Sequence, residues 1–176
     1  YPKKVLNLCA VYGILGLSMN LINGFTGQFS LGQAGFMAVG AYTTTLLTLP
    51  PATKEMVFYL KPIVPWLKDV RIPFFFALLA GGLLTALIAF LVGFPVLRLR
   101  GDYLAIATLG FSEIIRVVFT NLQSITNGST GIKGVPATAN LYWNFGALAV
   151  IVALVVLLLK TSYGRAFKAI RDDDVA

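Results

Sequence analysis

The chain has 176 residues, of which 57% are hydrophobic and 12% are charged. A soluble domain of this length carries roughly twice that share of charge, so the composition excludes an ordinary soluble protein and predicts an integral membrane protein. The sequence contains one cysteine, Cys9, and no histidine, which excludes an internal disulfide, a catalytic triad and a zinc site. A net charge of +7 does not indicate nucleic-acid binding, because the basic residues lie at the ends of apolar stretches and form no stripe with aromatic side chains.

Apolar stretches predict an all-helical, polytopic protein embedded in the lipid bilayer. Five of them occur, over residues 5–23, 30–49, 73–97, 103–122 and 144–159. Most approach the ~20 residues that a helix needs to cross the hydrocarbon core. The first is longer than the apolar core of a signal peptide and leads directly into a polar segment, so we interpret it as a retained span.

A segment rich in glycine and amide side chains, here called the glycine seam (residues 20–35), joins the first two spans. A bilayer tolerates irregular, polar backbone only beside protein or a water-filled cavity. Neutral amide groups suit a zwitterionic or amide solute better than an ion that needs fixed charge. The seam therefore indicates either a solute pathway or close helix packing with amides bonded across helices. As a pathway it would use Asn20, Asn23, Gly24, Thr26, Gly27, Gln28, Ser30, Gly32, Gln33 and Gly35.

The connector after the fourth span carries a second glycine-rich cluster, over residues 126–134. Its glycines are spaced like those of a phosphate cradle, but no Gly-Lys-Ser/Thr follows, so we expect no ATP binding in this chain. A turn-rich outer loop explains the cluster. The alternative is a loop that folds back toward the pathway, which Asn127 and Ser129 would then line.

Two opposite charges, Glu113 and Arg116, lie inside the fourth apolar stretch. Residues three positions apart share one face of a helix. Charges at membrane depth are costly and are usually paired. We expect an intramembrane ion pair that orients the helix rather than a proton relay; alternatively, Arg116 lies near the outer interface and needs no partner.

Basic residues predict the orientation of the chain. They gather after the last span and at the end of the third, whereas the connector after the fourth span has only Lys133. Because basic loops stay on the cytoplasmic side, we place the C-terminal tail there. Five full crossings would then leave Lys3 and Lys4 outside. One explanation is that basic residues further along the chain decide the orientation despite these lysines. The other is that one segment is re-entrant or broken, with residues 24–33 as the candidate.

The tail over residues 161–176 predicts a short amphipathic helix with mixed charge. An anionic lipid surface would repel its three consecutive aspartates, so a protein partner explains the tail better.

Ordered motifs along nearly the whole chain carry a family resemblance. They are Leu17-Ser18-Met19-Asn20-Leu21-Ile22-Asn23-Gly24, Gly27-Gln28-Phe29-Ser30-Leu31-Gly32-Gln33-Ala34-Gly35-Phe36, Gly40-Ala41-Tyr42, Arg98-Leu99-Arg100-Gly101-Asp102-Tyr103, Ala107-Thr108-Leu109-Gly110-Phe111, Thr126-Asn127-Gly128-Ser129 with Gly131-Ile132, and Gly164-Arg165-Ala166 with Ala169-Ile170-Arg171. The sequence resembles the permease subunits of branched-chain amino acid ABC importers, the LivM-like side in particular.

The resemblance implies a permease in the bacterial inner membrane that pairs with a second permease subunit. A periplasmic solute-binding protein would deliver leucine, isoleucine or valine, and two cytoplasmic ATPase subunits would bind ATP and Mg and drive alternating access. The chain itself would then be no enzyme and would hold no cofactor or metal. Within the same family, urea or short amides are the alternative substrates. A channel or secondary carrier that works without ATP is the alternative outside the family.

By the same resemblance, residues 1–160 form an incomplete permease domain, and residues 161–176 begin a cytoplasmic coupling helix that docks on an ATPase. Family members usually have histidine where Gln33 stands, and their coupling helix and further spans continue where this chain ends, so we expect a fragment. The coupling residues implied are Gly164, Arg165, Lys168, Arg171, Asp172, Asp173 and Asp174.

Overall fold

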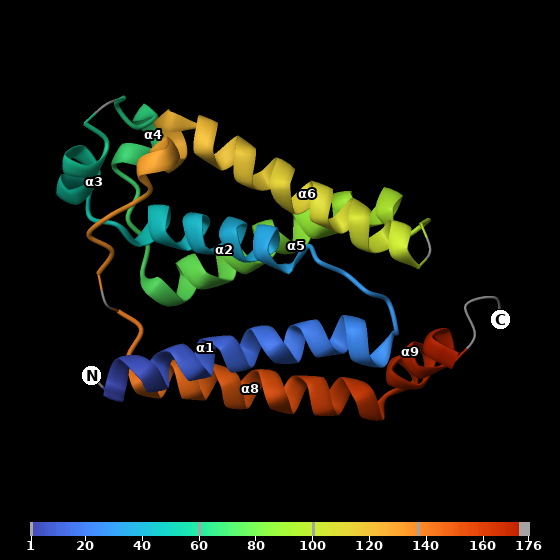
Figure 1. Cartoon of the computed structure of the whole chain (residues 1–176). Helices are drawn as coiled ribbons and strands as arrows, with labels where there is room; N and C mark the ends of the chain where they lie inside the picture. The colour runs from blue at the N-terminus through green and yellow to red at the C-terminus, as the bar shows by residue number, and fades with distance from the viewer. Residues whose placement is uncertain (1, 60, 100, 137, 173–176) are drawn as a thin grey trace. The chain divides into compact units, whose positions relative to one another are not determined.

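The computed structural model describes residues 2–59, 61–99, 101–136 and 138–172, apart from the side chains of Lys168, Ile170 and Asp172. Every regular element within these ranges is helical, as the composition predicts (Figure 1). The described helices that are long and apolar enough to cross a membrane are Pro2–Phe25, Phe74–Val96, Asp102–Asn121 and Leu141–Lys160. The chain is therefore a multi-pass membrane protein.

The chain divides into two compact units. The first unit comprises residues 1–30, 100–104 and 137–176, and the second comprises residues 31–99 and 105–136. The boundary between residues 30 and 31 falls inside the glycine seam. Each unit is described by itself below.

Two long helices form the first unit. Helix α1 (Pro2–Asn20) packs along α8 (Leu141–Lys160), and a Cβ atom added at Gly13 would lie 3.5 Å from Leu148, which is ordinary van der Waals contact. Helix α1 continues into the π-helix η1 (Leu21–Phe25), and the short helix α9 (Ser162–Asp172) follows α8. Helix α9 returns to contact η1. π-Helical turns are rare in proteins, and those that occur often lie at functional sites.

Helices α2 (Gln33–Thr48), α5 (Phe74–Val96) and most of α6 (Asp102–Asn121) form the body of the second unit. The contact between α2 and α5 is the most extensive contact of two helices in this unit, and a glycine lies in it. A Cβ atom at Gly81 would lie 2.6 Å from the hydroxyl oxygen of Thr44 and 3.1 Å from the carbonyl oxygen of Gly40. The absent side chain at Gly81 thus lets the two backbones approach closely.

Helix α2 is shorter than the span predicted over residues 30–49. It has 16 residues, a length of about 24 Å against the ~30 Å of a hydrocarbon core. Residues 26–32 before it are not helical. The helical structure is therefore interrupted between η1 and α2. This interruption lies in the segment, residues 24–33, that the sequence indicated as the candidate for a broken span.

The proline-rich connector between α2 and α5 folds into two short helices, α3 (Pro51–Val57) and α4 (Pro65–Lys68). Each has proline near its start, where the ring fixes a helical φ and the missing N–H is not needed. Apolar side chains of the connector, Phe58, Ile63 and Leu67, form a buried cluster with Leu46 of α2.

A buried lysine fastens this connector. Lys54 on α3 is fully buried, and its Nζ donates hydrogen bonds to the carbonyl oxygens of Leu67 (2.8 Å) and Val70 (2.7 Å). Burial lowers the pKa of Lys54, and the nearby carboxylate of Asp69 opposes this change more weakly. The connector is therefore held to the end of α4 by an ammonium group that water does not reach.

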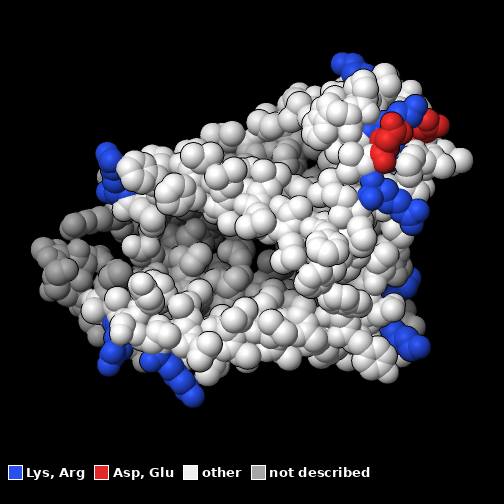
Figure 2. Space-filling model, turned by 180° about the vertical axis from the view of Figure 1, so that it is seen from behind, with Lys and Arg blue, Asp and Glu red and all other residues white. Residues whose placement is uncertain are grey.

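An exposed ion pair links the same two short helices. Lys68 Nζ lies 2.8 Å from Glu55 Oε1. The hydrogen bond from Lys68 and its charge lower the pKa of Glu55, and the same contact raises the pKa of Lys68. Figure 2 shows acidic and basic side chains gathered at the α3–α4 end of the second unit.

Candidate functional site

The seam residues that belong to the first unit form a turn closed by amide and hydroxyl groups. Asn23 accepts at Oδ1 a hydrogen bond from the backbone N–H of Ser30, 3.1 Å away, and the hydroxyl of Thr26 donates to the carbonyl oxygen of Ile22. Asn20 lies on the exposed side of α1, and Gln28 is half-buried. The Asn23 side chain thus binds the backbone of another seam residue, Ser30.

Arg171 on α9 lies against two seam glycines. Its Nη1 donates to the carbonyl oxygen of Gly24 at 3.5 Å. A Cβ atom added at Gly27 would lie 2.8 Å from Arg171 Cγ, and the φ of Gly27, +68°, is one that glycine adopts without strain. The seam and the predicted coupling helix are thus in direct contact.

The other predicted coupling residues lie in different surroundings. Gly164 is buried where α8 gives way to α9, and a Cβ there would collide with the backbone of Leu159. Arg165 donates from Nη2 to the hydroxyl of Ser162 at 3.2 Å. The side chains of Lys168 and Asp172, together with Asp173 and Asp174, lie outside the described residues.

Three of the pathway residues predicted in the seam belong to the second unit, at the start of α2. Gly32 and Gly35 are buried and Gln33 is half-buried. The backbone N–H of Leu31 donates to the hydroxyl of Thr108 on α6 at 3.0 Å. A Cβ atom at Gly35 would lie 2.9 Å from the Cα of Ser112. The beginning of α2 is therefore anchored closely on α6.

Asn127 and Ser129 lie at the opposite end of α2 from these three residues. Asn127, between α7 (Gln123–Thr126) and the 3₁₀-helix η2 (Gly128–Thr130), has a left-handed φ of 61° and donates from Nδ2 to the Gly131 carbonyl oxygen at 2.8 Å. Asn127 is buried and Ser129 is exposed. Gly131 lies beside Tyr42, seven residues and about 10 Å along α2 from Gly35. The structure therefore does not bring this loop to the start of α2.

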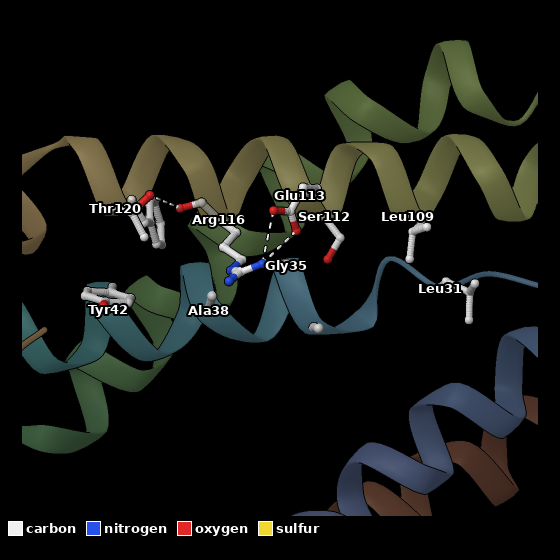
Figure 3. A pocket seen from close by; sticks show the side chains of 11 residues that line it. Leu31, Gly35, Ala38, Tyr42, Leu109, Ser112, Glu113, Arg116 and Thr120 are labelled. Atoms are coloured by element: carbon white, nitrogen blue, oxygen red, sulfur yellow. Dashed lines mark hydrogen bonds and ion pairs between the residues drawn. The ribbon is translucent and has the colours of Figure 1, made fainter. Parts of the chain in front are cut away.

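A pocket of about 390 Å³ lies between α2 and α6 within the second unit (Figure 3). Small residues of α2 make one wall, and the rings of Tyr42 and Phe119, 4.9 Å apart and edge to face, stand at one end. The full lining is Leu31, Ala34, Gly35, Ala38, Tyr42, Leu109, Ser112, Glu113, Arg116, Phe119 and Thr120.

Both charges of the predicted ion pair face this pocket. Arg116 Nη1 lies 3.1 Å from Glu113 Oε1 and 3.3 Å from Oε2, and Figure 3 shows the guanidinium directed from α6 toward α2. Their side chains are 74% and 59% exposed. The hydroxyl of Thr120 donates to the Arg116 carbonyl oxygen at 3.1 Å. The pocket thus combines a cation, an anion and hydroxyl groups with apolar walls.

Sequence reasoning identified the pair but not the pocket beside it. The spacing of Glu113 and Arg116 places them on one face of α6, whereas the opposite wall comes from Ala34, Gly35 and Ala38, far away in the sequence. The described residues hold no cluster of three or more metal-ligating side chains.

The chain matches, over residues 1–176, the family described as branched-chain amino acid transport system, permease component. It is 34% identical to the high-affinity branched-chain amino acid transport system permease protein LivM of Escherichia coli (strain K12), and 35% identical to the protein of the same name in Salmonella typhimurium. Each of these alignments covers 98% of this chain and 44% of the relative.

A third relative is the probable branched-chain amino acid transport permease protein LivM of Methanocaldococcus jannaschii, 26% identical over 93% of this chain and 54% of the relative. The chain thus spans about half the length of the relatives it matches. No solved structure matches the chain. The chain belongs to the branched-chain amino acid transport permease family.

Proposed function

We propose that this chain is part of a permease subunit of an ATP-driven importer of leucine, isoleucine and valine. The observation that carries the proposal is the family match over the whole chain, joined by relatives of 34% and 35% identity that are named as branched-chain amino acid permease proteins. The four helices of membrane-crossing length among the described residues support the role of a membrane subunit.

The proposed complex contains a second permease subunit, two cytoplasmic ATPase subunits and a periplasmic solute-binding protein. ATP and Mg are bound by the ATPase subunits, and this chain holds no cofactor. The sequence supports that division of labour because its glycine-rich cluster at residues 126–134 lacks the Gly-Lys-Ser/Thr of a nucleotide loop.

The proposed location is the bacterial inner (plasma) membrane, with the C-terminal tail in the cytoplasm. Residues 160–171 contain four basic residues, whereas the connector over residues 123–143 contains one. Basic segments remain on the cytoplasmic side of a membrane. Helix α9 would thereby lie where an ATPase subunit can reach it.

The proposed mechanism is alternating access, in which residues 1–160 form the moving permease domain and residues 161–176 receive the movement of the ATPases. The contact of Arg171 with Gly24 and Gly27 supports a direct route from α9 to the seam. A broken segment is a natural place for such a change, because half-helices and exposed backbone line transporter sites. If uptake and substrate choice were unchanged after Asn23→Ala and Gln28→Ala, the seam would serve helix packing only.

Deletion and complementation in cells test the proposed function. A strain that lacks the full-length gene should lose high-affinity leucine uptake and regain it from a plasmid copy, while a plasmid copy truncated before residue 161 should not restore uptake. If the deletion left leucine uptake unaffected and abolished uptake of urea or a short amide instead, the proposed substrate assignment would be wrong.

A further inference from the structure

We propose that the pocket between α2 and α6 binds the transported amino acid as a zwitterion, with Arg116 receiving its carboxylate and Glu113 its ammonium group. The inference rests on the proposed function and assigns a substrate site within it. Its first basis is size: a pocket of about 390 Å³ falls in the range of about 300–1,000 Å³ that is usual for small-molecule sites.

The second basis is charge. Glu113 and Arg116 both line the pocket, and their side chains remain 59% and 74% exposed although they contact each other at 3.1 Å. A guanidinium carries five donors and a carboxylate can accept about four hydrogen bonds. The pair uses a single nitrogen, Arg116 Nη1, which contacts both Glu113 oxygens, so both groups retain capacity for further hydrogen bonds. An amino acid carries its carboxylate and ammonium on the same carbon, which matches two opposite charges placed side by side.

The third basis is position along the membrane. Glu113 lies eight residues before the end of α6 at Asn121, about 12 Å along the helix axis. Ionised side chains at such depth usually face protein or a water-filled cavity and mark substrate pathways. A pair that served only to orient α6 would need no pocket beside it.

Apolar surface completes the match to a branched aliphatic side chain. In Figure 3, Leu31 and Leu109 stand at one end of the pocket and Tyr42 at the other, with the ion pair between them. The end near Leu31 and Leu109 offers methyl and methylene groups to the aliphatic part of the solute. Hydroxyl groups of Ser112 and Thr120 lie on the same wall as the charges.

Coupled uptake by the complete complex tests the proposal. The full-length permease, its partner subunits and the binding protein are reconstituted in proteoliposomes, and labelled leucine moved per ATP hydrolysed is measured. Glu113→Gln and Arg116→Gln should each lower this ratio about tenfold or more, because a hydrogen bond to a charged group contributes roughly one to two powers of ten to binding. Ratios equal to that of the unaltered complex would overturn the proposal.

Exchange of the two charges separates binding from helix orientation. The double variant Glu113→Arg, Arg116→Glu keeps an ion pair at the same spacing but reverses the positions of the cation and the anion. A pair that only orients α6 would regain normal uptake in this variant, which would contradict the proposal. A substrate site should remain impaired about tenfold, because the charges then face the wrong ends of the solute.

Filling the pocket provides a test that leaves both charges in place. Ala34 lines the pocket, whereas Ala41, also exposed on α2, does not. Ala34→Leu should lower leucine moved per ATP, and Ala41→Leu should not. Equal effects of the two variants would overturn the proposal. Failure of the complex to assemble with Ala34→Leu alone would also overturn it, because the pocket would then be filled by another protein segment rather than by the solute. An unaltered complex that moves no leucine with ATP would instead refute the proposed function itself.

Discussion

Arg171 and Gly24 are 147 positions apart in the sequence, yet the Arg171 Nη1 atom lies 3.5 Å from the Gly24 carbonyl oxygen. The same side chain lies against Gly27, where a Cβ atom would be 2.8 Å from its Cγ. Helix α9 therefore contacts the π-helical end of the first span directly. Movement of α9 would reach the seam without passing through the length of a spanning helix.

Gly27→Ala tests this contact. The new methyl group would displace Arg171, and alanine at a φ of +68° is strained by about 1–2 kcal/mol. We expect ATP hydrolysis by the reconstituted complex to continue while leucine uptake falls severalfold. Gly16→Ala is the matched control, because a Cβ atom at Gly16 meets nothing within 4 Å. Equal uptake in the two variants would show that the contact does not transmit the movement.

Lys54→Met should destabilise the second unit. The change removes two hydrogen bonds and leaves the carbonyl oxygens of Leu67 and Val70 without their donor, at a cost of about 1–3 kcal/mol for each group that stays buried. The check is the thermal unfolding midpoint of the full-length permease in detergent. Lys61→Met, an exposed position in the same connector, should change the unfolding free energy by less than about 0.5 kcal/mol. Similar midpoints for both variants would show that Lys54 does not fasten the connector.

The lowered pKa of Lys54 predicts how stability changes in alkaline solution. Burial favours the neutral amine, so between the folded pKa and the unfolded value of 10.5 the unfolded chain binds more protons. The free energy of unfolding contributed by Lys54 should therefore rise with pH across that window and fall as pH drops through the folded pKa. The neutral amine retains two N–H donors for its two carbonyl partners. The rise should be absent from Lys54→Met, and its persistence there would assign it to another group.

Gly81→Ala should separate α2 from α5. The added methyl group would meet the Thr44 hydroxyl and the Gly40 carbonyl oxygen, and overpacking of this kind destabilises by roughly 1–3 kcal/mol. The adjacent Gly82 is a matched control, because a Cβ atom there meets nothing within 4 Å. We expect a lower unfolding midpoint in detergent for Gly81→Ala and an unchanged or slightly raised midpoint for Gly82→Ala. The opposite order would contradict glycine-mediated packing of these two helices.

Hydropathy and glycine content predicted most of the helices and the position of the break. Residues 73–97 and 144–159 read as spans from composition alone, and α5 and α8 contain them almost completely. The start of α2 could not be predicted in the same way, because residues 30–49 are apolar or small apart from Gln33. Its first turn depends on contacts with Thr108 and Ser112 of α6, which lie more than 70 positions away in the sequence.

The buried lysine and the pocket illustrate what the sequence could not provide. Lys54 stands in a basic, proline-rich connector, and nothing in its local pattern distinguishes it from the exposed Lys61. Its burial arises from the way α3 packs on α4. The spacing of Glu113 and Arg116 fixed their common face on α6, but the pocket exists only because small residues of α2 lie opposite. Such non-local packing leaves no periodic signal in the chain.

ATP-dependent uptake of labelled leucine, with urea in parallel, tests the central claim most directly. The full-length permease is reconstituted in proteoliposomes with its neighbouring permease, ATPases and binding protein. We predict leucine uptake that requires ATP and every partner, that discriminates against urea, and that is lost when Arg171 is replaced by glutamine in a complex that still assembles. Leucine uptake that proceeds without ATP or without the partner subunits would contradict the importer and identify a carrier or channel.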